Sequence, residues 1–127
     1  MKLNPGVAAI AAIWLGSGIA FGAFGAHGLK EQLSAQYLAV FETGVRYQMY
    51  AGFGLLFFSI CGDYMKWPVR LLIWGSFIFC LSVYAVSLNE LFGDSLKKFG
   101  AIAPIGGLSM IAAWAWAAWI WMKNKTK

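Results

Sequence analysis

The sequence predicts an all-α membrane protein with four transmembrane helices, and three observations lead to this fold class. Hydrophobic residues make up 61% of the 127 residues and charged residues only 12%, whereas charged residues form about 25% of a soluble domain. Four apolar runs follow one another along the chain. Short polar connections separate them. Because one span needs about 20 residues, four spans use nearly the whole chain, and we expect a single domain over residues 1–127.

The first apolar run, residues 6–26, has 21 residues. A helix of that length covers about 31 Å, enough for a bilayer core of about 30 Å. A signal peptide has a shorter apolar region of about 7–15 residues, so we expect a retained span. Gly18, Gly22 and Gly25 share one face of this helix, which predicts close packing against another helix. Whether that helix belongs to the same chain or to another subunit stays open.

The first span ends at His27, the only histidine in the chain, with Gly28 directly after it. A histidine can carry protons near neutral pH because its ordinary pKa is about 6.5. The structural interpretation places His27 beside the last carbonyls of the helix and Gly28 in a left-handed cap. We favour the structural interpretation and keep the proton carrier as the alternative.

An amphipathic pattern over residues 29–50 predicts an interfacial helix between the first and second spans. The uncharged part of the second span, residues 47–62, is only 16 residues long, so we expect the span to cover about 42–62. It then carries Glu42 and Arg46 toward the membrane boundary. These residues stand four apart and can pair on one helix face.

The charged segment supplies the candidate polar site, formed by His27, Glu42, Arg46 and Tyr47. Ionisable groups within a span are candidates for function because they are costly to bury in lipid. A carboxylate and a guanidinium here could bind a small solute or pass a proton. The alternative is a structural pair that fixes this helix against its neighbours. Whether Glu42 pairs with Arg46 or with His27 stays open.

The third and fourth spans are expected over about 69–88 and 99–122. Pro104, near the start of the fourth span, predicts a kink or a broken first turn. Gly106 and Gly107 follow it and are predicted to pack against another helix.

The loop cations predict the orientation in the membrane. With four spans, both termini and the connection 63–70 lie on one side, which carries six of the ten Lys and Arg residues. Four of the five acidic residues lie on the other side. Because cytoplasmic loops are rich in cations, we expect cytoplasmic termini.

The sequence also argues against several function classes. Cys61 and Cys80 lie within or at the end of apolar runs and are predicted to pack there, although a disulfide between them stays open. No metal or cofactor is expected, and the basic excess indicates membrane lipid rather than nucleic acid. The chain contains no HExxH, GxSxG or phosphate-binding loop, so we expect no enzyme activity.

Four segments, taken in order, resemble the domain of unknown function 423 family of small bacterial inner-membrane proteins, to which transmembrane protein 256 is similar. These segments are residues 22–29, 41–50, 76–84 and 103–107. The resemblance implies a four-span membrane protein and carries no established activity. The family commonly has a histidine where this chain has Ala51, which further lowers the expectation of a metal site.

From these observations we predict a structural or scaffolding helical bundle of the bacterial inner membrane. The helix-packing glycines outnumber the groups that could do chemistry. A homo-oligomer and contacts with other membrane proteins are both compatible with this prediction. The alternative function is binding or transport of a small solute or proton at His27, Glu42 and Arg46.

Overall fold

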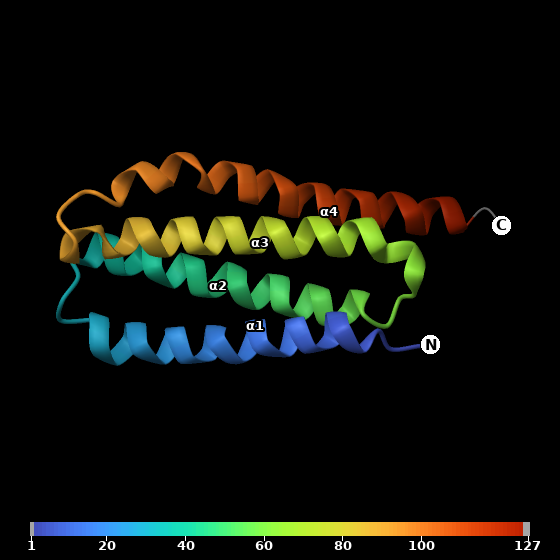
Figure 1. The fold of residues 1–127 in the computed structure, drawn as a ribbon, viewed down its shortest axis with the longest axis horizontal. Coiled ribbons are helices and arrows are strands. Elements are labelled where there is room, and N and C mark those ends of the chain that lie inside the picture. The colour runs from blue at the N-terminus through green and yellow to red at the C-terminus, as the bar shows by residue number, and fades with distance from the viewer. Residues whose placement is uncertain (1, 126–127) are drawn as a thin grey trace.

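The computed structural model describes residues 2–125. Within them the chain forms four long α-helices: α1 (Pro5–Phe24), α2 (Ala35–Phe58), α3 (Lys66–Ser87) and α4 (Ala103–Asn124). Figure 1 shows the four helices lying lengthwise with alternating direction, with both chain ends at the same end of the molecule. The helical fold class is confirmed.

The first two helices begin at side-chain caps. The Oδ1 atom of Asn4 accepts a hydrogen bond from the backbone N–H of Val7 at 3.2 Å, and the Oγ atom of Ser34 accepts one from Tyr37 at 3.4 Å. Each cap binds an N–H group that the first helical turn leaves without a partner. The helix starts therefore follow from short polar residues placed just before apolar runs.

The prolines lie in first turns, where their missing N–H group costs no hydrogen bond. Pro68 is the third residue of α3, and Pro104 is the second residue of α4. A short 3₁₀ helix, Lys97–Ala101, comes before α4. The break expected near Pro104 is thus the change from this 3₁₀ helix into α4.

The expected interfacial helix is not a separate element in the described part of the chain. After α1 the backbone forms a π-helical turn, Gly25–Leu29, and α2 begins at Ala35. The amphipathic stretch is therefore the first half of one helix of 24 residues. Ser34 supplies the cap at this point, and no proline interrupts the helix before it ends at Phe58.

Three of the long helices, together with their flanking turns, are long and apolar enough to cross a membrane. These stretches are Pro5–Leu29, Asp63–Leu91 and Lys97–Asn124. The helix α2 is not among them, although it lies between α1 and α3 and packs on both. Glu42, Arg46 and the polar residues around them lower its apolar character.

Buried side chains form two clusters, one toward each end of the molecule. The cluster nearer the termini joins all four helices through residues that include Ala11, Leu55, Leu72 and Ala113. The other cluster contains Leu29, Leu33, Phe41, Cys80 and Tyr84.

At the end away from the termini, hydrogen bonds hold the connection between α3 and α4 against the helices. The side chain of Asn89 is fully buried; its Nδ2 atom donates to Asp94 Oδ1 at 2.8 Å, and its Oδ1 atom accepts from the N–H of Leu96 at 3.2 Å. The neighbouring Glu90 accepts a hydrogen bond from the N–H of Ser34 at 3.0 Å. This places a carboxylate at the N-terminus of α2, where the helix dipole favours negative charge.

Candidate functional site

The charged pair predicted from the sequence lies on the outer surface of α2. Glu42 and Arg46 are both exposed. Their side chains form no ion pair or hydrogen bond with each other or with another residue among those the structure describes. Both groups are therefore open to contact from outside this chain.

His27 lies in the π-helical turn Gly25–Leu29 and is exposed. Its ring makes no hydrogen bond within residues 2–125. The left-handed cap considered for Gly28 is wrong, because Gly62 and Gly93 are the glycines with positive φ in the described chain. The ring of Phe24 lies against Gly28 instead: a Cβ added there would be 2.8 Å from that ring.

Tyr47 faces α3 and α4. Its ring lies 5.1 Å from that of Phe79 and 5.5 Å from that of Tyr50, and it lines an apolar cavity of about 350 Å³ together with Met110 of α4. No hydrogen bond, ion pair or ring contact in the described structure joins His27, Glu42, Arg46 and Tyr47. No group of three or more His, Cys, Asp and Glu residues within 2–125 could hold a metal ion.

A buried polar contact between the helices is made by Gln48, which sequence reasoning did not select. Its side chain is fully buried. The Nε2 atom donates to the carbonyl oxygen of Trp14 at 2.9 Å and to Ser17 Oγ at 2.8 Å. The Oε1 atom accepts from the hydroxyl of Tyr84 at 2.6 Å. One amide thus joins α1, α2 and α3.

These hydrogen bonds satisfy the buried amide, as burial away from water requires. The partners are neutral, so the contact offers no strong acid or base for proton transfer. The sequence carries one signal for this contact. A single glutamine stands among the apolar residues that follow Arg46, and such a side chain must find hydrogen-bond partners inside the protein. The indole Nε1 of Trp14 is also buried and has no hydrogen-bond partner in the described structure.

The predicted packing glycines differ in what they face. A Cβ at Gly18 would lie 2.9 Å from the Sδ atom of Met49, one at Gly22 3.3 Å from Val45, and one at Gly25 2.9 Å from the ring of Phe41. These neighbours are side chains on α2. The closest approach of two backbones involves Gly106, where a Cβ would lie 2.5 Å from the backbone nitrogen of Phe79 and 2.6 Å from the carbonyl oxygen of Gly75. Gly107 is different, because a Cβ there would lie 3.7 Å from the Phe79 ring.

The cysteines are free thiols. Cys80 is fully buried and Cys61 is partly exposed. The Sγ atom of Cys80 lies 3.5 Å from the carbonyl oxygen of Gly44, and that of Cys61 lies 3.4 Å from the carbonyl oxygen of Phe57. Each thiol therefore lies beside a backbone carbonyl oxygen of a helix.

The sequence profile of a family described as protein of unknown function, DUF423, matches residues 21–107. The chain belongs to the DUF423 family. It is 42% identical over 97 residues to a UPF0382 membrane protein of Staphylococcus saprophyticus, with 73% of this chain and 77% of the relative covered. It is 33% identical over 105 residues to the UPF0382 membrane protein YwdK of Bacillus subtilis, covering 76% and 79% of the two chains. No solved structure matches the chain.

Membership in this family identifies a small membrane protein whose function the family description leaves open. The names of these relatives point to the membrane and to no catalysed reaction. The resemblance drawn from four sequence segments is confirmed.

Proposed function

We propose that the protein is a four-span structural bundle of the bacterial inner membrane, with cytoplasmic termini, which associates with a second copy of itself through the outer face of α2. The observation that carries this proposal is the exposure of Glu42 and Arg46 on α2, a helix that packs between the candidate spans containing α1 and α3. The six cations on the side of the termini support the orientation.

We infer the depth of α2 from its neighbours. Gly18 lies beside the midpoint of the candidate span Pro5–Leu29, and it faces Met49 and Gln48 of α2. A helix of 24 residues is about 36 Å long, enough to cross a hydrocarbon core of about 30 Å. We therefore take α2 as the fourth span, with its amphipathic first turns at the interface.

The outer face of α2 carries a stripe formed by Glu42, Arg46, Tyr50, Phe53 and Phe57, hereafter the α2 stripe. Their spacing of three and four residues puts them on one helix face. Tyr50 is 58%, Phe53 58% and Phe57 50% exposed. Arg46 is the twelfth of the 24 residues of α2, so with α2 as a span it would lie deeper than the membrane boundary expected from the sequence. Near the bilayer centre an arginine in lipid costs about 2.5–3.5 kcal/mol on the insertion scale.

A second copy would remove this cost. In a twofold-symmetric pair with parallel α2 helices, Glu42 of one copy faces Arg46 of the other, and the symmetry forms the contact twice. The two residues are one helical turn apart, within reach of their long side chains. The aromatic residues of the α2 stripe would extend the same contact toward the end of α2.

The interior supports a structural role. The buried polar side chains that join α1, α2 and α3 are neutral and bonded to one another, as at Gln48 and Tyr84. The glycines Gly18, Gly22, Gly25 and Gly106 let helices approach closely, and in lipid such approach drives helix association. We assign these glycines to helix packing within the bundle.

Native mass spectrometry of the protein, extracted gently from its own membranes, tests the proposal. We expect a dimer for the wild type and a monomer for Arg46→Glu, because the substitution puts four acidic groups together at the contact. Lys30→Glu is the matched control, since it reverses a charge in the connection before α2 and should leave the dimer intact. A wild-type monomer, or an Arg46→Glu dimer, would contradict the proposal.

The second candidate function is binding or transport of a small solute or proton at His27, Glu42, Arg46 and Tyr47. It draws on the same observation, because Glu42 and Arg46 have no side-chain partner within the described chain and can accept an external one. The same spectra distinguish it. A defined small mass that is retained by the wild type and lost in Glu42→Gln would favour a ligand site over a contact between copies.

A further inference from the structure

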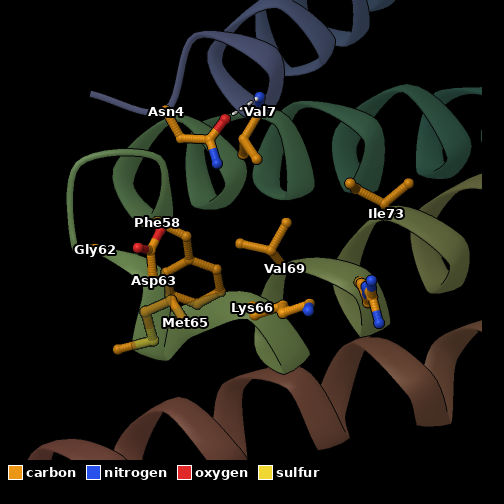
Figure 2. A pocket seen from close by; sticks show the side chains of 10 residues that line it. Asn4, Val7, Phe58, Gly62, Asp63, Met65, Lys66, Val69 and Ile73 are labelled. Atoms are coloured by element: carbon orange, nitrogen blue, oxygen red, sulfur yellow. Dashed lines mark hydrogen bonds between the residues drawn. The ribbon is translucent and has the colours of Figure 1, made fainter. Parts of the chain in front are cut away.

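A groove opens at the end of the molecule that holds the termini. It has a volume of about 620 Å³ and lies between the start of α1, the end of α2 and the start of α3. In Figure 2, Val7 on α1 faces Val69 and Ile73 on α3 across the opening. The volume falls in the range of about 300–1,000 Å³ that holds small ligands.

The floor and the rim of this groove differ in chemistry. Its floor is apolar: Phe58 and Met65 are 1% exposed and Val69 is 8% exposed. Its rim carries the exposed cations Lys66 and Arg70 against the single acid Asp63. Because Lys66 and Arg70 stand four apart on α3, both project from the same helix face. The groove is thus basic at its mouth and apolar inside.

Polar donors at the rim are available for a ligand. The Oδ1 atom of Asn4 is used by the helix cap at Val7, whereas its Nδ2 atom has no partner within residues 2–125 and points toward the cavity in Figure 2. The backbone N–H of Asn4 donates to the carbonyl oxygen of Ser59 at 2.8 Å. This bond joins the residue before α1 to the connection after α2, and these two segments form two walls of the groove.

The groove lies at the level of the membrane boundary. The candidate spans begin at Pro5 and Asp63, and the first turns of both line the groove, so the long side chains of Lys66 and Arg70 can reach the lipid headgroups. The guanidinium carbon of Arg70 lies 5.2 Å from the ring centre of Trp67. Tryptophan and arginine side chains typically occupy the headgroup region.

We propose that this groove binds one anionic phospholipid. The phosphate lies between Lys66 and Arg70, the amide of Asn4 donates a hydrogen bond to the headgroup, and one acyl chain runs along Val7 and Ile73. Basic pockets between spanning helices bind anionic headgroups in this way. The net positive rim selects a lipid of net negative charge over a zwitterionic one. The proposal does not depend on how copies of the chain associate.

Native mass spectrometry with added lipid tests this site. The protein in mild detergent receives either phosphatidylglycerol or phosphatidylcholine, and the bound mass is counted. We expect one phosphatidylglycerol per chain at concentrations where phosphatidylcholine stays unbound. Each basic residue near an anionic headgroup contributes roughly a fivefold factor in affinity, so Lys66→Gln/Arg70→Gln should weaken binding about 25-fold. Lys97→Gln/Lys98→Gln is the matched control at the opposite end.

A second variant keeps the cations and fills the apolar part of the groove. Ile73→Trp should also lose the lipid, because the acyl chain no longer fits beside Val7. Lys66 and Arg70 are exposed, so their variants should keep the wild-type helix content by circular dichroism. Equal retention of both lipids, or phosphatidylglycerol binding unchanged in either variant, would overturn the proposal.

Discussion

The hydroxyl of Tyr84 on α3 lies 2.6 Å from Oε1 of Gln48 on α2, and the amide nitrogen of the same Gln48 donates to Trp14 and Ser17 on α1. Ser17 itself donates to the carbonyl oxygen of Trp14 at 3.1 Å. A shift of one helix along another would break these bonds together. Since hydrophobic burial does not drive association between helices in lipid, such directional contacts help fix how α1, α2 and α3 align.

Gln48→Leu should destabilise the protein by about 1–2 kcal/mol, because the buried hydroxyl of Tyr84 loses its acceptor and Ser17 loses a donor. The free energy of unfolding can be measured by titration with sodium dodecyl sulfate, followed by tryptophan fluorescence. Gln36→Leu is the matched control, since Gln36 is exposed on the same helix and its replacement should change stability by less than about 0.5 kcal/mol.

A double-mutant cycle with Tyr84→Phe isolates the contact itself. If the hydrogen bond stabilises the fold, the double variant should be less destabilised than the sum of the single variants, by about 0.5–1.5 kcal/mol. Strict additivity would mean that Gln48 and Tyr84 act independently, and it would contradict the alignment role given to this pair.

Sequence reasoning predicted the fold well and the buried contact poorly, for physical reasons. The apolar runs indicated four helices, because a membrane protein must satisfy its backbone hydrogen bonds within each helix, and three of the four are long and apolar enough to cross a membrane. Gln48 was inside a segment singled out for its charges, and although its apolar neighbours indicate burial, nothing local identifies the partners of a buried amide. Its partners are 31 to 36 residues away, and only the packing of three helices brings them together.

Gly106→Ala should destabilise the protein by about 1–3 kcal/mol. A Cβ at this position would lie 2.5 Å from the backbone nitrogen of Phe79, and backbone atoms cannot rotate away as a flexible side chain can, so α3 and α4 must separate. Thermal unfolding followed by circular dichroism measures the effect.

The neighbouring Gly107 provides the control on the same helix. A Cβ at Gly107 would be 3.7 Å from the ring of Phe79, an ordinary contact, and alanine favours a helix over glycine by up to about 1 kcal/mol. We expect Gly107→Ala to be neutral or stabilising. Equal destabilisation by both substitutions would contradict the close approach of α3 and α4 at Gly106.

The expected interfacial helix is not a separate element, because helical periodicity does not show where one helix ends and the next begins. An amphipathic pattern that continues into an apolar one, without a proline or a cap between them, fits one long helix as well as two short ones. The π-helical turn Gly25–Leu29 was equally hidden, since its glycines suit several backbone conformations.

Cys61 offers a natural probe of membrane orientation. It lies in the connection between α2 and α3 and is partly exposed, whereas Cys80 is fully buried. With cytoplasmic termini, a membrane-impermeant maleimide should label Cys61 in inverted vesicles and not in intact spheroplasts. Cys61→Ser should abolish labelling, because Cys80 is inaccessible. Labelling in spheroplasts would reverse the proposed orientation.

The exchange of charges on the α2 stripe tests how two copies face each other. Glu42→Arg and Arg46→Glu should each lower the dimer fraction at least about tenfold, since each puts like charges opposite one another in a medium that screens them poorly. The double variant Glu42→Arg/Arg46→Glu has the same net charge as the wild type and again places opposite charges in contact, so it should restore the dimer. The dimer fraction can be followed by native mass spectrometry over a dilution series. A double variant as monomeric as either single one would contradict pairing between Glu42 of one copy and Arg46 of the other.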